Sequence, residues 1–217
     1  MKTIKKIKIN KPKKNTPLLL GIWLTEKSKM KLREQNPALI LVDIQKGFSD
    51  EDYWGGNRNN KDAEVVCGTI LRKWRELNLP VFHIRHSSTN PNSRLYKQNP
   101  GFDFNDNVLP NENEPVITKN VNIAFIGTDL KDQLDSLGIK VLVFVGLTTN
   151  NCISSTVRMS GNFGYENYLI SDATATFDRI GVNHLKYDSE TIHLKSLANL
   201  KEEFATIWDS KKLMEKI

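Results

Sequence analysis

The chain has 217 residues, 39% of them hydrophobic, which is enough for one α/β domain with a sizeable core. Its two cysteines, Cys67 and Cys152, are too few for a disulfide framework, so a reducing, cytoplasmic setting is expected. The net charge of +6 arises in the first 25 residues, which hold seven lysines and no acid. The remainder is near neutral, which argues against a nucleic-acid-binding surface on the domain.

The N-terminal residues 1–35 are predicted to be a basic, partly disordered extension, followed by a domain over residues 36–217. A solvated tail is favoured over a segment that touches RNA or a membrane. The apolar residues 18–24 are too short to span a bilayer, and no small-residue cleavage site of a secretion signal follows them. We expect this apolar segment to pack on the domain or on a partner subunit.

Strands and helices alternate along the rest of the sequence. Apolar, β-branched runs predict strands, and apolar residues three or four apart predict helices between several of them. Strands that are apolar throughout indicate a three-layer, doubly wound (Rossmann-like) α/β fold with a mostly parallel sheet. The predicted strands are 38–42, 81–84, 116–118, 141–145, 168–170 and 204–208, and the predicted helices are 62–78, 127–137, 151–161 and 188–200.

One long stretch, residues 86–114, has no strand or helix period and is rich in proline, glycine and asparagine. Long irregular loops in compact domains are usually functional. We expect this loop to form a wall of the site or a subunit contact.

Three predicted strand ends carry chemically useful side chains. Asp43 follows the first strand, Lys119 follows the third and Cys152 follows the fourth, at the start of a helix. The carboxyl ends of parallel strands face the ligand crevice, and an ammonium and a helix N-terminus both favour a thiolate. Asp43 can take the thiol proton and return it to a leaving amine. These residues predict a nucleophilic enzyme, whereas position alone leaves open that Cys152 is a small core residue.

The candidate substrate-binding residues are Gln45, Phe48, Trp54 and His86. Aromatic rings close to Asp43 are suited to stacking on a planar substrate, although packing beneath a loop explains them nearly as well. His86 lies past the end of the second strand, where a role in the pocket and a loop contact are equally open.

The sequence resembles the isochorismatase-like cysteine hydrolases. The resemblance runs from residue 37 to residue 208 and rests on Asp-Ile-Gln-Lys-Gly-Phe at 43–48, Val-Ile-Thr-Lys at 116–119 and Gly-Leu-Thr-Thr-Asn-Asn-Cys-Ile at 146–153. It implies Cys152 as nucleophile, Asp43 as acid and base, and Lys119 as the cation that lowers the thiol pKa. It also implies a cis peptide between Leu147 and Thr148, an oxyanion hole built from the backbone N–H groups of Thr148 and Cys152, and a homo-oligomer.

The expected activity is hydrolysis of a C–N bond in a small amide or ureido compound, through a thioester and without metal or cofactor. Metal-dependent nicotinamidases of this family carry an Asp-x-His after the first strand, whereas this chain has Asp-Glu-Asp at 50–52 and its first histidine is His83. Two alternatives stay open. One is vinyl-ether hydrolysis of the isochorismate type, with Cys152 as a bystander, and the other is an inactive scaffold. The expected partner is a small molecule, with no nucleic acid and no membrane.

Overall fold

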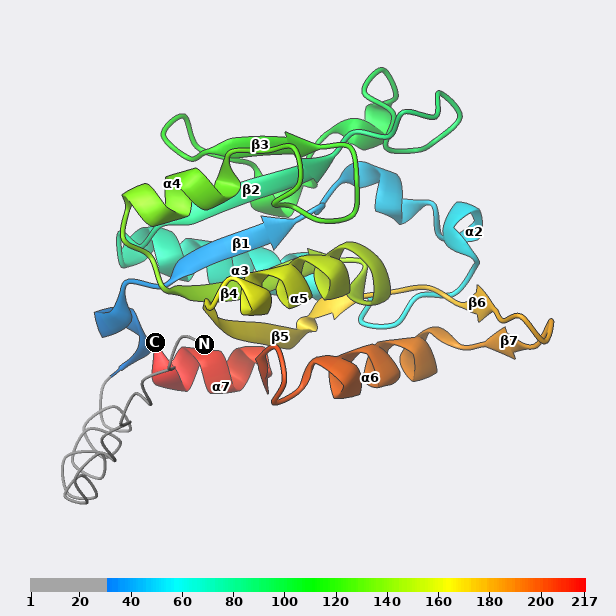
Figure 1. Ribbon diagram of the computed structural model, residues 1–217. Helices are drawn as coiled ribbons and strands as arrows, with labels where there is room; N and C mark the ends of the chain where they lie inside the picture. The colour runs from blue at the N-terminus through cyan, green and yellow to red at the C-terminus, as the bar shows by residue number, and fades with distance from the viewer. Residues whose placement is uncertain (1–30) are drawn as a thin grey trace, which may run out of the picture. The chain divides into compact units, whose positions relative to one another are not determined.

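The computed structural model describes residues 31–217, and their compact unit begins at Leu32 (Figure 1). The predicted basic extension and its apolar segment at 18–24 lie outside the described residues. The unit opens with a turn of 3-10 helix, η1 (Leu32–Gln35), in which Leu32 is buried in the core. No helix in the described part of the chain is both long enough and apolar enough to cross a membrane.

A six-stranded sheet forms the centre of the domain, and all of its neighbouring strands are parallel. The order β3-β2-β1-β4-β5-β8 reverses between β1 and β4, as in a doubly wound fold. All six predicted strands form, and the predicted fold class is confirmed. The strands are β1 (Ala38–Val42), β2 (Val81–His86), β3 (Val116–Lys119), β4 (Val141–Leu147), β5 (Glu166–Ala175) and β8 (Thr206–Trp208).

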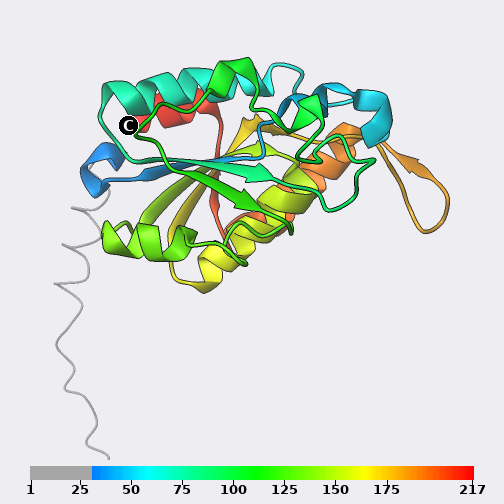
Figure 2. The same ribbon diagram turned by 90° about the horizontal axis from the view of Figure 1, so that it is seen from above.

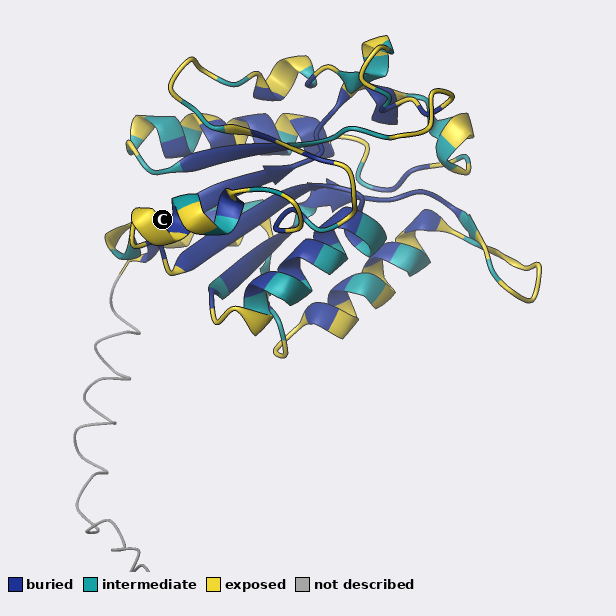
Figure 3. Ribbon diagram, turned by 45° about the horizontal axis from the view of Figure 1, so that its top comes forward, coloured by how far each residue is buried: buried dark blue, intermediate teal, exposed yellow. Residues whose placement is uncertain are grey.

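Helices cover both faces of the sheet, which gives three layers (Figures 2 and 3). Side chains alternate along β1, so that Leu39 and Leu41 pack under α3 and α7, whereas Ile40 and Val42 pack on the opposite face, where α4, α5 and α6 lie. The four predicted helices form with slightly different ends. The helices are α2 (Glu51–Trp54), α3 (Ala63–Glu76), α4 (Leu130–Ser136), α5 (Ser154–Asn162), α6 (Ser189–Leu200) and α7 (Ser210–Lys216).

The sequence did not predict α2, α7 or the small hairpin of β6 (Arg179–Ile180) and β7 (Lys186–Tyr187). Only Leu213 of α7 is buried, so the helix has no apolar period to recognise. Figure 1 shows the hairpin projecting from the body of the domain, with Ile180, Val182 and Leu185 exposed. Such side chains suit a contact with another subunit, and self-association stays a prediction.

The irregular residues 86–114 are a chain of turns, with short 3-10 helices η3 (Pro100–Phe102) and η4 (Asp106–Val108). Hydrogen bonds from side chains to the backbone hold these turns, where a sheet or a helix would have regular backbone hydrogen bonds. Asn99 donates through Nδ2 to the carbonyl of Ser93 at 2.7 Å. The loop therefore has a fixed course without any sequence period.

The strands β1 and β4 are in tight contact at Gly146, which pairs with Val42. Gly146 has φ of 125°, and a Cβ added there would lie 2.0 Å from the Val42 carbonyl oxygen. Only glycine allows this approach. The residues directly after the contact, Asp43 on one strand and Leu147 on the other, therefore start side by side.

Replacement of Gly146 by alanine should strongly lower the free energy of unfolding. Gly127→Ala is the matched control, because Gly127 also has a positive φ, of 68°, but has open space around the added carbon. The control should lose about 1–2 kcal/mol from its backbone conformation alone. Gly146→Ala should lose about 1–3 kcal/mol or more beyond that from overpacking. Urea denaturation of both variants measures the difference, and equal losses would contradict the role given to this contact.

Candidate active site

Three strand ends bring Asp43, Lys119 and Cys152 into contact. Asp43 follows β1, Lys119 is the last residue of β3, and Cys152 lies in η5 (Thr149–Ile153), the turn between β4 and α5. The Lys119 Nζ atom lies 2.7 Å from Asp43 Oδ2 and 3.4 Å from Cys152 Sγ. The structure thus brings together the three side chains that the sequence singled out.

The Asp43–Lys119 ion pair is buried, since both side chains are 0% exposed. Cys152 is 8% exposed and is the most exposed of the three residues. The Asp43 Oδ1 atom is buried and has no hydrogen-bond partner within the described part of the chain. Asp43 therefore has one carboxylate oxygen held by Lys119 and one free to accept a proton.

The resting state of Cys152 differs from the sequence-based expectation of a thiolate. Burial raises the pKa of the Cys152 thiol, and the negative charge of Asp43 raises it further. Lys119, whose ammonium lies 3.4 Å from the sulfur, lowers this pKa by less than burial and Asp43 together raise it. The sequence placed a cation at this site but could not show that a buried carboxylate offsets it. Cys152 thus rests as a thiol beside a proton acceptor.

A cavity of about 100 Å³ opens onto the thiol. Of the four predicted substrate-binding residues, Phe48, Trp54 and His86 line it. The rings of Phe48 and Trp54 lie 4.7 Å apart between centroids, and the Trp54 indole donates to the Gly47 carbonyl at 2.8 Å, which fixes the aromatic wall. The lining residues are Phe48, Trp54, His86, Leu95, Asn122, Thr148, Asn151 and Cys152. Leu95 comes from the irregular loop, in keeping with the expectation that this loop forms a wall.

Gln45 is not among the residues that line this cavity, and its contact with substrate stays a prediction. Its amide is 1% exposed and is used by the backbone. Nε2 donates to the carbonyls of His86 and Phe102, at 3.1 and 2.8 Å, and Oε1 accepts from the His86 N–H at 2.8 Å. Gln45 therefore joins the end of β1 to β2 and the irregular loop, and both of its Nε2 protons are used by backbone carbonyls.

Two amide side chains at the cavity were missed by the sequence analysis, Asn122 and Asn151. The Asn122 Oδ1 atom lies 3.7 Å from Cys152 Sγ, within reach of a weak S–H donor. Its position three residues after Lys119 was the only signal available. An exposed asparagine in a loop gives no pattern from which a contact with a distant cysteine follows.

The backbone before Cys152 turns sharply. The peptide between Leu147 and Thr148 is cis, as the resemblance implied. The Thr148 carbonyl accepts from the N–H groups of Asn151 and Ile153, at 3.1 and 3.3 Å. The Thr149 hydroxyl contacts His193 Nδ1 at 2.9 Å, which ties the turn to α6. These contacts hold Thr148 and Cys152 together at the cavity.

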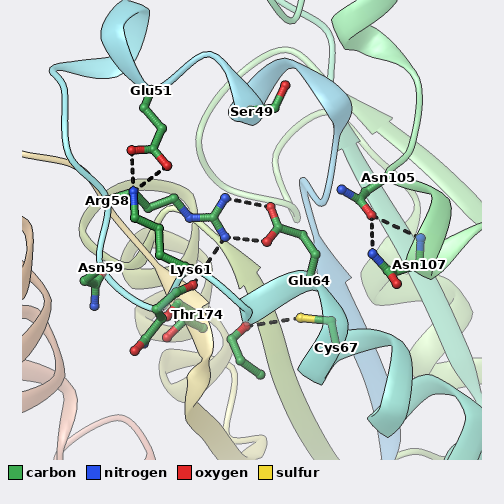
Figure 4. Close-up of polar contacts among 12 residues, drawn as sticks. Ser49, Glu51, Arg58, Asn59, Lys61, Glu64, Cys67, Asn105, Asn107 and Thr174 are labelled. Atoms are coloured by element: carbon green, nitrogen blue, oxygen red, sulfur yellow. Dashed lines mark hydrogen bonds and ion pairs between the residues drawn. The ribbon is translucent and has the colours of Figure 1, made fainter.

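A second buried ion pair supports the segment that carries Trp54. Figure 4 shows the Arg58 guanidinium facing the Glu64 carboxylate of α3 through two parallel contacts.

Cys67, on helix α3, donates to the Ala173 carbonyl at 3.2 Å. Burial raises the pKa of the Cys67 thiol well above its ordinary range. Cys67 is thus a core residue, as expected.

A metal ion fits this site poorly. Ligand atoms of Asp43, His86 and Cys152 lie within 4.8 Å of one another, a spacing that a metal could bridge. The Lys119 ammonium already contacts all three side chains, at 2.7, 3.3 and 3.4 Å. A cation would have to displace it against charge repulsion.

A doubly wound α/β sheet that gathers a carboxylate, an ammonium and a thiol beneath a small cavity has the features of an enzyme that acts on small molecules. Residues 37–212 match the family model of the isochorismatase domain. The chain belongs to the isochorismatase family of hydrolases.

Similar proteins cover nearly the whole domain. The isochorismatase family protein YrdC of Bacillus subtilis (strain 168) is 46% identical over 181 residues, which are 83% of this chain and 96% of the relative. The crystal structure of a hydrolase of the family from Chromobacterium violaceum ATCC 12472 is 37% identical, with a TM-score of 0.82 over 86% of this chain and 96% of that one. More distant relatives with a named activity include nicotinamidase 3 of Arabidopsis thaliana, which is 26% identical over 87% of this chain and 94% of its own length.

Replacement of Asp43 by asparagine should increase the reactivity of Cys152 while turnover is lost. The neutral amide removes a charge that raises the thiol pKa, while its oxygen can still accept a hydrogen bond from the Lys119 ammonium. A fall of one pKa unit speeds alkylation by iodoacetamide at pH 7 about ten-fold. Mass spectrometry of the labelled Cys152 peptide measures this rate, with the exposed Asp132→Asn as control. A rate that stays the same or falls would show that Asp43 does not set the thiol pKa.

Proposed function

We propose that this protein hydrolyses the C–N bond of a small, uncharged amide or ureido compound, with Cys152 as nucleophile. The composition of the cavity carries this proposal. Among residues 31–217, the side chains that line it are aromatic, aliphatic, amide, hydroxyl, imidazole and thiol groups, with no arginine or lysine. Aromatic faces and amide groups suit a planar, neutral substrate whose carbonyl reaches the thiol.

The reaction starts from the neutral thiol. Asp43 accepts the thiol proton on its free oxygen, the sulfur attacks the carbonyl carbon, and a C–S bond forms. The backbone N–H groups of Thr148 and Cys152 are the proposed donors to the resulting oxyanion. Asp43 then gives its proton to the leaving nitrogen as the C–N bond breaks, which leaves a thioester on Cys152.

Hydrolysis of the thioester repeats these proton transfers with water. Asp43 takes a proton from the water, whose oxygen attacks the acyl carbon, and the C–S bond breaks. The proton returns to the sulfur and the carboxylic acid leaves. Lys119 keeps its charge throughout, so that a negative charge on either Asp43 or Cys152 always has a cation in contact.

Vinyl-ether hydrolysis of the isochorismate type is less well supported. Isochorismate carries two carboxylates, and carboxylates are usually bound by arginine or lysine side chains. Lys119 is 1% exposed and paired with Asp43, so it is not available to a carboxylate in the cavity. The inactive-scaffold alternative gives no reason for a buried ion pair to contact a thiol at the mouth of a cavity.

Small neutral amides and ureido compounds screened for release of ammonia or amine should reveal the activity. Cys152→Ala should lower turnover by at least about 10³-fold, because the nucleophile is removed. Cys67→Ala is the matched control and should keep it. Rapid quenching and intact-mass measurement should find the acyl group on Cys152. Turnover of isochorismate that survives Cys152→Ala would favour the alternative reaction instead.

Chelation should leave hydrolysis unchanged, since the Lys119 ammonium occupies the space that a metal would need. The test compares turnover before and after dialysis against EDTA. Loss of activity on dialysis, with recovery on addition of zinc, would contradict a metal-independent site.

A further inference from the structure

The Lys119 ammonium has three protons and three neighbouring acceptors. Asp43 Oδ2 lies at 2.7 Å, His86 Nδ1 at 3.3 Å and Cys152 Sγ at 3.4 Å. An ammonium can only donate, so the Nδ1 atom of His86 must present its lone pair. The single proton of the neutral ring is then on Nε2, and Lys119 fixes this tautomer.

His86 is held in this place by its own backbone. It forms the last pair of the β2–β3 ladder, directly opposite Lys119. Gln45 accepts from its N–H at 2.8 Å and donates to its carbonyl at 3.1 Å. This clamp explains why Gln45 is buried away from the cavity. It sets the position of the residue whose ring touches the ammonium.

We propose that His86 is a positioning residue whose neutral imidazole, together with Asp43, holds the Lys119 ammonium against Cys152, and that a proton on His86 stops the reaction by removing this acceptor. The effect on turnover rests on the proposed function. The effects on the tautomer and on the reactivity of Cys152 do not depend on it.

The sign of the pH effect follows from the groups that face the ring. These are Lys119 from β3, Asp43 after β1 and the Cys152 thiol from η5. Burial lowers the pKa of His86 below its ordinary value of 6.5, Lys119 lowers it further, and Asp43 opposes this. The ring is therefore neutral at pH 7. As the pH falls through the lowered pKa, a second cation appears beside Lys119 and activity declines.

Two substitutions separate positioning from a simple role as cavity wall. His86→Leu removes the acceptor. His86→Asn offers an amide oxygen near the place of Nδ1 and cannot be protonated. Loss of a hydrogen bond to a charged group should lower kcat and the alkylation rate of Cys152 roughly 10- to 100-fold in His86→Leu, with a much smaller change in KM. His86→Asn should recover most of both rates, and its loss of activity at acid pH should move to lower pH.

The control is the same exchange at an exposed histidine, His184→Asn, which should change neither rate nor pH profile. A His86→Leu variant that matches the unaltered protein in alkylation, or a His86→Asn variant with an unshifted acid limb, would overturn the proposal. Nitrogen-15 NMR of the unaltered protein gives a test that needs no variant to fold and no substrate. The proposal requires the Nε2–H tautomer at pH 7, and finding Nδ1–H or an imidazolium would refute it.

Discussion

The ion pair between Asp43 and Lys119 is the interaction on which the rest of the site depends. Two charges that are almost fully withdrawn from water are tolerated only when each has a partner, because an unpaired buried charge costs several kcal/mol. The ends of β1 and β3 are not neighbours in the sheet, since β2 separates them. The pair therefore spans β2, and the last residue of that strand, His86, lies beside it as a further acceptor.

The same pair places two opposite charges beside the Cys152 thiol. Lys119 favours the thiolate form of Cys152, whereas burial and Asp43 disfavour it. Together with the neutral thiol, Asp43 and Lys119 keep the net charge of the three side chains at zero. Asp43 has a positive φ of 53°, which is uncommon for a residue other than glycine and places its carboxylate at the turn after β1.

Sequence patterns were sufficient to predict the sheet, the main helices and the convergence of Asp43, Lys119 and Cys152. Apolar periodicity indicates which residues are buried, and residues that follow parallel strands lie at the same edge of the sheet. They were insufficient where a property depends on the distance between residues that are far apart in the sequence. The residue type of Gln45 suggested a ligand contact, but its partners are backbone groups that a sequence does not place. Asn122 reaches Cys152 from an exposed loop. The thiol pKa depends on burial and on two opposing charges whose separations only coordinates supply.

A cysteine that rests as a thiol is a poor target for oxidants. Peroxides attack the thiolate, and redox-sensing cysteines are accessible and have a low pKa. Cys152 has the opposite properties, being 8% exposed with a pKa raised by its surroundings. These surroundings disfavour oxidation of Cys152 to sulfenic acid. The second thiol, Cys67, is 1% exposed and packs in the core cluster on the opposite face of the sheet from Cys152, so it is not placed to form a disulfide with it. Neither cysteine therefore has the exposure and the low pKa that a redox switch requires.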